Sequence, residues 1–207
     1  MGKETTLQQL AKDAIYVEQE VIQEVVGCQD QIAVACGGFN RINFLPDGNF
    51  EVKPIRVTSS RLTTLQDHLM LYFTGFSRFA SQIEASKLVN FSSRKQELQR
   101  MMQMVTHAEY LLTDETRDLQ EFGSMLQEAW DYKKSLSSGV TTTAIDDIYN
   151  RAIAAGAIGG KILGAGGGGF MLFFVAPENQ SAVRKALNGL IEVPFRFEQE
   201  GSRVVLG

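Results

Sequence analysis

The amino-acid sequence predicts an α+β fold in which helices pack on one face of a mainly antiparallel sheet. Apolar residues recur at helical spacing near the start of the chain and again through much of its middle. Short apolar runs bounded by turn residues, typical of strands, lie at 69–74 and 170–176. From residue 69 onward the order is strand, helices, two strands, helix and strand, which favours helices layered on a sheet. We expect two domains, residues 1–65 and residues 66–207.

The first part of the chain is expected to hold one amphipathic helix and a β-hairpin. The helix begins after Thr6, which can form a capping box with Gln9, and its apolar stripe runs toward Val26. The strands of the hairpin are predicted at 39–44 and 50–57, on either side of the turn sequence Pro-Asp-Gly-Asn.

The second part is expected to alternate strands with helices. A helical region covers residues 79–132 with a break at 113–116, and a polar loop follows it at 133–139. Thr143, with Asp146 three residues later, is expected to cap the next helix. The remaining chain is expected to hold strands at 161–163 and 170–176, a helix from Pro177 to about Leu190, and a closing hairpin of 193–197 with 204–206.

Composition and charge exclude several classes of function. The formal net charge is −4 and no basic block stands out, which argues against a nucleic-acid partner. No apolar run approaches the roughly 20 residues that a membrane-spanning helix needs. No targeting signal precedes the first helix, so the expected compartment is the cytoplasm. Cys28 and Cys36 lack metal-ligand spacing, so we expect reduced thiols and no metal site.

A glycine-rich run, Gly-Ala-Gly-Gly-Gly-Gly at 164–169, lies between two predicted strands. It satisfies the pattern GxGxxG, but a dinucleotide-binding turn leads into a helix, and this run leads into an apolar strand. No Lys-Ser or Lys-Thr follows it, as a Walker loop requires. A hairpin turn with positive φ angles is one interpretation. The other is close approach of the backbone to a phosphate or to another backbone, because five glycines exceed the needs of a tight turn.

Four motifs, taken together, resemble those of a known family. Gly159–Gly169 is similar to the third, C-terminal motif of the GHMP kinases, the group of galactokinase, homoserine kinase, mevalonate kinase and phosphomevalonate kinase. Gly27–Gln31 with Gly37–Asn40 is similar to the segment that bears the catalytic aspartate of that family. Thr74–Arg78 and Trp130–Ser138 are similar to a narrower branch, the bacterial D-glycero-D-manno-heptose 7-phosphate kinases. The resemblance extends from the first helix to the C-terminus.

The resemblance implies a kinase that transfers the γ-phosphoryl group of ATP, with Mg²⁺, to a hydroxyl group of a sugar or sugar phosphate. In the heptose branch this is the anomeric hydroxyl of a sugar 7-phosphate. It implies that Asp30 is the catalytic base, whereas the residues alone favour a helix cap. The residues implied to bind substrate are Gln29, Gly38, Thr74, Ser77, Arg78, Lys133 and Lys134. The loop implied to border the phosphate site consists of Gly164, Ala165, Gly166, Gly167, Gly168 and Gly169.

The charged residues of this set have structural alternatives. A guanidinium at Arg78, at the end of a buried strand, can hold a phosphate by two parallel hydrogen bonds, or it can form a surface ion pair. Lys133 and Lys134 follow a helix, and lysines there also interact favourably with the helix dipole.

The sequence departs from the family pattern near its start. A second glycine-rich loop, which in the family holds the nucleotide phosphates, should lie before the helix that begins near Leu7, and it is missing. Residues 1–65 are therefore interpreted as the remnant of a GHMP kinase N-terminal domain, with exposed apolar surface that promotes association, for example as a homodimer. Three readings remain open: a fragment of a sugar kinase, a non-catalytic sugar-phosphate-binding or regulatory paralogue, and an unrelated interaction protein.

Overall fold

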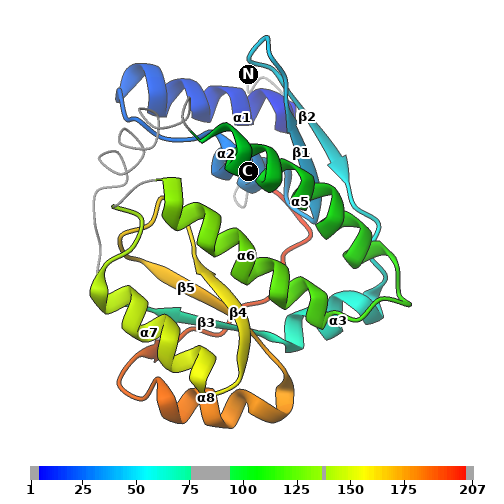
Figure 1. Cartoon of the computed structure of the whole chain (residues 1–207). Coiled ribbons are helices and arrows are strands. Elements are labelled where there is room, and N and C mark those ends of the chain that lie inside the picture. Colours follow the sequence, from blue (N-terminus) through cyan, green and yellow to red (C-terminus); the bar gives the residue numbers. More distant parts are fainter. Residues whose placement is uncertain (1–4, 76–93, 137–138, 204–207) are drawn as a thin grey trace. The chain divides into compact units, whose positions relative to one another are not determined.

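The computed structural model describes residues 5–75, 94–136 and 139–203 of the chain (Figure 1). The chain divides into two compact units. The first unit contains the residues up to Arg56 and, from the other end of the chain, those from Arg196 onward. The second unit is Val57–Phe195. This division differs from the expected ranges 1–65 and 66–207, since the C-terminal segment belongs with the start of the chain.

The first unit begins with a helix that ends earlier than the sequence predicts. Helix α1 is Leu7–Tyr16, and a π-helical turn, η1, follows at Val17–Val21. The hydroxyl oxygen of Thr6 accepts a hydrogen bond of 3.1 Å from the backbone N–H of Gln9, which confirms the predicted cap. Gln23 has a φ angle of 62°, in the left-handed region, so helical geometry stops before it.

A second helix and the predicted hairpin follow in the first unit. Helix α2 is Gln29–Cys36, and strands β1 (Asn40–Phe44) and β2 (Phe50–Pro54) pair in antiparallel register. In the turn between them, the backbone N–H of Asn49 donates to the carboxylate of Asp47 at 3.0 Å. The small core of this unit is formed by the buried side chains of Ala11, Ile32, Ala35 and Phe50.

The C-terminal segment crosses the end of α2, which corrects the closing hairpin expected at 193–197. Residues 193–203 contain no strand. The backbone N–H of Ser202 instead donates to the carbonyl oxygen of Val34 at 3.1 Å. The crossing is very close, because a Cβ atom on Gly37 would lie 2.1 Å from the backbone nitrogen of Gly201. Glycine is therefore required where the two backbones cross.

The second unit is built on a four-stranded antiparallel sheet in the order β4-β5-β3-β6, of which Figure 1 labels β3, β4 and β5. Its strands are β3 (Leu69–Phe73), β4 (Ala157–Ile162), β5 (Phe170–Val175) and β6 (Ile191–Glu192). Its helices are α3 (Ser59–Asp67), α5 (Lys95–Thr113), α6 (Gln120–Leu136), α7 (Thr143–Ala154), the 3₁₀ turn η3 (Pro177–Asn179) and α8 (Gln180–Ala186). Strand, helices, two strands, helix and strand give the β-α-β-β-α-β arrangement of a split βαβ fold. The predicted α+β class and antiparallel sheet are thus confirmed.

Helices pack against both faces of this sheet rather than the single face expected. Strand β5 is apolar at every position, and its successive side chains point to opposite faces. Phe173 belongs to a buried cluster with residues of α7 and α8. Phe174, on the other face, lies so close to α6 that a Cβ atom on Gly123 would be 2.7 Å from its ring. A strand that is apolar on both sides needs cover on both sides.

Several element ends in the second unit differ from the prediction. Helix α6 continues through Leu136, where a polar loop was expected to begin at residue 133. Lysines suit the last turn of a helix because its carbonyl ends carry partial negative charge. The cap of α7 is Thr142, whose hydroxyl accepts from the backbone N–H of Ile145, and not Thr143. Helix α3 was not expected at all.

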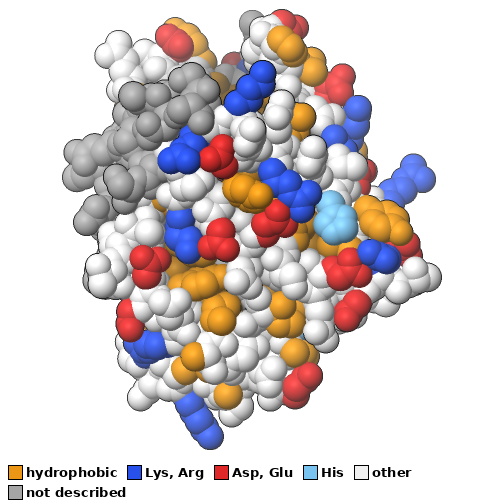
Figure 2. Space-filling model, in the orientation of Figure 1, with side chains coloured by type: hydrophobic (Ala, Val, Ile, Leu, Met, Phe, Trp, Pro, Cys, Tyr) orange, Lys and Arg blue, Asp and Glu red, His pale blue; other side chains and the backbone are white. Residues whose placement is uncertain are grey.

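Charged side chains of both signs lie close together over α5 and α6 (Figure 2). Arg100 of α5 donates two hydrogen bonds, of 2.7 and 3.0 Å, to the carboxylate of Glu128 in α6. Arg117, just before α6, donates one hydrogen bond of 2.8 Å to the carboxylate of Glu121 four residues later. Within the described ranges, none of the helices has the length and apolar character that crossing a membrane requires.

Candidate functional site

The glycine-rich run forms the loop between β4 and β5, and we call Gly164–Gly169 the glycine loop. Four of its glycines have positive φ angles: Gly164 (65°), Gly166 (110°), Gly167 (74°) and Gly169 (91°). Residues with a side chain rarely adopt such angles. The high glycine content is therefore a requirement of the loop's conformation, as one of the two interpretations of the sequence held.

One side of the glycine loop packs against the segment that precedes α7. A Cβ atom on Gly166 would lie 2.7 Å from the carbonyl oxygen of Val140, and the backbone N–H of Gly167 donates to that oxygen at 2.9 Å. At the two ends of the loop the space is open, since a Cβ atom on Gly164 or Gly169 would meet nothing within 4 Å. Bare backbone next to open space is a geometry that can border a phosphate group.

Thr74, a predicted substrate-binding residue, lies at the end of β3 and is bonded to the glycine loop. Its side chain is buried, with 1% of the residue exposed. Its backbone N–H and its hydroxyl both donate to the carbonyl oxygen of Gly169, each at 2.9 Å. The structure therefore uses these polar groups of Thr74 to hold the last residue of the loop.

Lys133 and Lys134 occupy the last turn of α6 and contact different groups. The ammonium group of Lys133 donates to the carbonyl oxygen of Ile162 at 3.2 Å and to that of Gly164. Lys134 forms an ion pair of 3.0 Å with Asp131, and its ammonium lies 5.6 Å from the centre of the Trp130 ring. Lys133 thus contacts the first residue of the glycine loop, whereas Lys134 packs on the core.

Two buried polar atoms near Lys134 have no hydrogen-bond partner in the described part of the chain. They are the Nε1 atom of Trp130 and the hydroxyl oxygen of Tyr149. Burial and, to a smaller extent, the negative charge of Asp131 raise the pKa of Tyr149 to about 12. The ammonium of Lys134 also lies 5.8 Å from the centre of the Tyr149 ring.

Asp30, the predicted base, is an exposed residue in the first turn of α2 in the first unit. A carboxylate is favoured there by the partial positive charge of the helix N-terminus. The N-cap position belongs to Cys28, so Asp30 does not serve as the cap. Gln29, also exposed, begins the same helix. The carboxylate is thus accessible, and its catalytic role stays a prediction.

Gly38, also predicted to bind substrate, lies where the C-terminal segment meets α2. It has a φ angle of 73°, and its backbone N–H donates to the carbonyl oxygen of Glu198 at 3.1 Å. The hydrogen bond that the structure describes at Gly38 therefore joins two segments of the fold. Ser77 and Arg78, the remaining substrate-binding predictions, lie outside the described residues.

The sequence does not show which groups hold the glycine loop. It shows neither the carbonyl oxygen that bonds to the middle of the loop nor the side chains that bond to its two ends. Val140 shows no sequence signal, because it acts through its backbone carbonyl oxygen.

Among the residues that the structure describes, no three or more His, Cys, Asp or Glu side chains gather in a way that could hold a metal ion.

Comparison with protein families confirms the resemblance found in the sequence. Residues 108–193 match the family model described as GHMP kinases C terminal. This match covers α6, α7, the glycine loop and the strands on either side of it.

Curated relatives extend the similarity over nearly the whole chain. A D-glycero-alpha-D-manno-heptose 7-phosphate kinase of Campylobacter jejuni subsp. jejuni is 35% identical over 199 residues, which are 93% of this chain and 58% of that protein. A mevalonate kinase of Thermococcus sibiricus is 27% identical over 212 residues, which are 98% of this chain and 59% of that protein. The chain thus spans somewhat more than half the length of these relatives.

Solved structures show the same fold. The crystal structure of a D-glycero-D-manno-heptose 1-phosphate kinase from Bacteroides thetaiotaomicron matches with a TM-score of 0.63 and 24% sequence identity. The match covers 96% of this chain and 55% of that one. At this identity the likeness concerns the fold and not the substrate.

Proposed function

Because residues 108–193 match the C-terminal family model of the GHMP kinases, we propose that the chain is part of a sugar kinase of this family. The reaction would transfer the γ-phosphoryl group of ATP to the anomeric hydroxyl of D-glycero-D-manno-heptose 7-phosphate. The observation that carries this proposal is the 35% identity, over 93% of the chain, to a heptose 7-phosphate kinase. Because the chain spans 58% of that relative, the activity is proposed for a protein of the family's full length.

The glycine loop supports the proposal as a border of the phosphate site. Phosphoryl transfer depends on positioning and on neutralising charge more than on covalent chemistry. The loop offers backbone without side chains, and space is open beside Gly164 and Gly169. We propose that the ATP phosphates lie along this open side. Mg²⁺ would be held by the phosphate oxygens, whose charge it neutralises.

Asp30 is proposed as the base of the reaction. The anomeric oxygen of the sugar would form a bond to the γ-phosphorus while the bond from phosphorus to the ADP oxygen breaks. The proton of the hydroxyl would pass to the Asp30 carboxylate. The exposure of Asp30 in the first turn of α2 leaves the carboxylate open to such a substrate. Replacing Asp30 by Asn is expected to abolish turnover while the protein stays folded, and near-normal turnover would remove Asp30 from the mechanism.

The first test is a calorimetric titration of the 207-residue chain with Mg-ATP. Saturable binding supports a phosphate site on the glycine loop, and turnover of heptose 7-phosphate is then measured by ADP release. No heat at millimolar nucleotide would mean that this chain lacks a nucleotide site of its own, as expected of a non-catalytic paralogue or of a chain that needs the family's other phosphate loop. Turnover of galactose or fucose in place of heptose 7-phosphate would overturn the proposed substrate.

A further inference from the structure

We propose that Lys133 is a positioning residue for the glycine loop. Its ammonium group fixes the backbone at the start of the loop in the conformation that borders a phosphate group. The identity of that ligand rests on the proposed kinase function. The effect of Lys133 on the loop does not, and it is tested below without a nucleotide.

The glycine loop needs external ties because its own residues supply few. Glycine loses more conformational freedom on folding than any other residue, and five of the six loop residues are glycine. At Gly164 and Gly169 nothing lies close enough for even a Cβ atom to touch. Side-chain packing therefore contributes little at these two glycines, and hydrogen bonds to the loop backbone have the larger part in holding it.

Among the described residues, hydrogen bonds from outside the loop reach it at three places, one at each end and one in the middle, while the backbone N–H of Leu163 donates to the carbonyl oxygen of Phe170 at 2.8 Å at its base. At the end of the loop, Thr74 donates twice to the carbonyl oxygen of Gly169. In the middle, Gly167 donates to the carbonyl oxygen of Val140. At the start, Lys133 donates to the carbonyl oxygen of Gly164 and, at 3.2 Å, to that of Ile162 at the end of β4. Lys133 thus joins the last residue of the strand to the first residue of the loop.

The chemistry of a lysine suits this task. An ammonium group has three donors, so it can donate to two carbonyl oxygens at the same time. Hydrogen bonds from a charged donor are stronger than neutral ones. The last turn of α6 carries Lys133 to this point, because α6 lies directly on β4 at Gly123 and Gly159. The ammonium also adds positive charge at one end of a loop proposed to face phosphate.

The neighbouring lysine shows that this contact is specific to Lys133. Lys134 lies in the same helix turn, but its ammonium group contacts Asp131 and the rings of Trp130 and Tyr149. The two lysines of the motif therefore have different contacts in the structure, although the family resemblance implied a substrate role for both.

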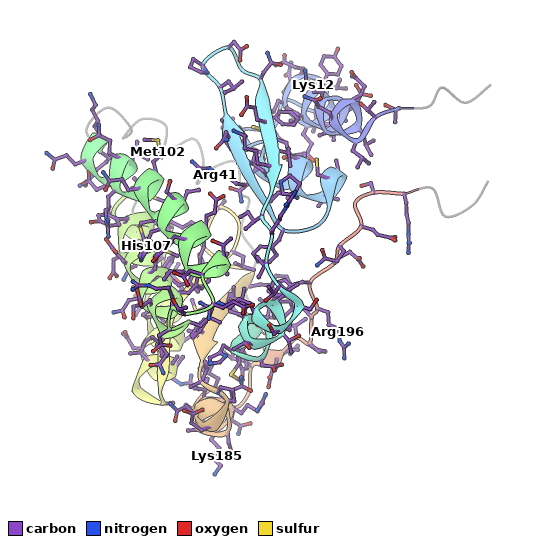
Figure 3. The ribbon with its side chains drawn as sticks, turned by 90° about the vertical axis from the view of Figure 1, so that its right-hand side faces the viewer. Lys12, Arg41, Met102, His107, Lys185 and Arg196 are labelled. Carbon is purple, nitrogen blue, oxygen red and sulfur yellow. The ribbon has the colours of Figure 1, made fainter. Side chains whose placement is uncertain are left out.

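The test measures the order of the loop glycines in the whole chain labelled with ¹⁵N-glycine. The amide order parameters of Gly164 and Gly167 are compared between wild type and Lys133→Met, which has similar length and no donor. Gly156, in the same unit but outside the loop, is the internal reference. Lys185→Met is the matched control, because Lys185 is an exposed lysine in the last turn of another helix and points away from α8 (Figure 3).

The expected result is a fall of the loop order parameters from about 0.85 to below about 0.6 in Lys133→Met, with Gly156 unchanged. Lys185→Met should resemble the wild type. Lys133→Arg, which keeps charge and donors, should keep the loop ordered. Unchanged loop order in a folded Lys133→Met protein would overturn the proposal.

A second variant covers the case in which Lys133→Met disturbs the whole unit. Lys133→Gln keeps one neutral donor and is a milder change. Loss of order confined to the loop in this variant supports the positioning role. Loss that includes Gly156 in both variants would overturn it, because Lys133 would then stabilise the unit as a whole.

If the chain binds Mg-ATP, the same variants connect loop order with affinity. Lys133→Met should weaken binding by about tenfold or more, as expected for loss of hydrogen bonds from a charged donor, and Lys133→Arg should restore most of it. A loop that loses its order without any change in a measurable Mg-ATP affinity would contradict the link to phosphate binding. If the kinase proposal fails instead, the glycine order parameters still decide the role of Lys133.

Discussion

The backbone of Gly159 in β4 passes so close to Gly123 in α6 that a Cβ atom on Gly159 would lie 2.1 Å from the Gly123 carbonyl oxygen. A Cβ atom on Gly123 would in turn lie 2.7 Å from the ring of Phe174. The two glycines let α6 lie directly on the edge strand of the sheet. This contact sets the height of the helix above the sheet, and Lys133 reaches the glycine loop from the last turn of the same helix.

Replacing Gly159 by Ala should therefore destabilise the second unit. The added methyl group meets backbone rather than a flexible side chain, so α6 must move away from β4. We expect a loss of about 1–3 kcal/mol, as for other overpacked sites, measured by urea denaturation. Gly27→Ala is the control, since nothing lies within 4 Å of a Cβ atom there, and its stability should stay within about 1 kcal/mol of wild type. Equal stability of the two variants would contradict the close contact.

Replacing Thr74 by Val should loosen the end of the glycine loop. The change keeps the shape of a buried side chain and removes the hydroxyl that donates to Gly169. A loss of about 0.5–1.5 kcal/mol in the free energy of unfolding is expected for one neutral hydrogen bond. Thr74→Ser keeps the hydroxyl, so its loop amides should remain as protected from hydrogen exchange as in the wild type. If the Gly167 amide loses its protection from hydrogen exchange in Thr74→Ser but keeps it in Thr74→Val, the hydroxyl does not have this role.

Replacing Tyr149 by Phe should cost little stability or even increase it. The hydroxyl of Tyr149 is buried without a described partner, so the folded state gains no hydrogen bond for removing it from water. We expect a change between zero and about +1 kcal/mol in the free energy of unfolding. The comparison is Tyr72→Phe, which removes a hydroxyl that donates to Glu192 at 3.4 Å. A loss above about 1 kcal/mol in Tyr149→Phe would show that the hydroxyl has a partner in solution.

The stability of the second unit should fall between about pH 10 and pH 12. Burial raises the pKa of Tyr149 and that of Tyr72 to about 12 each, with a smaller contribution from the charge of Asp131 for Tyr149 and of Glu192 for Tyr72. An unfolded tyrosine releases its proton near pH 10, whereas the folded one still holds it. The unfolded state therefore binds fewer protons in this window, and stability decreases as the pH rises. Urea titrations at pH 9, 10 and 11 should show this decrease, and Tyr149→Phe should make it shallower. An equal slope in both proteins would assign the pH dependence to other groups.

Local sequence patterns predicted the elements whose stabilising interactions are local or periodic. The strands β3 and β5 are apolar runs between turn residues, and the cap at Thr6 needs only a neighbour three residues away. Helix α3 was missed because its sequence is mostly polar. It is held by distant contacts: its buried Arg61 donates to the carbonyl oxygen of Leu111 at 2.6 Å, in the last turn of α5.

The sequence by itself determined that a glycine-rich loop joins two strands and that the chain resembles the GHMP kinases, and it favoured a helix start at Asp30. Only the tertiary structure decided which groups hold that loop and where the C-terminal segment lies. Thr74 and Lys133 donate hydrogen bonds to backbone carbonyl oxygens of the loop. Val140 accepts a hydrogen bond from the loop through its own backbone carbonyl oxygen. The segment around Ser202 likewise bonds to the backbone of α2. Every residue carries a carbonyl oxygen, so no pattern of side chains can tell which one will be used.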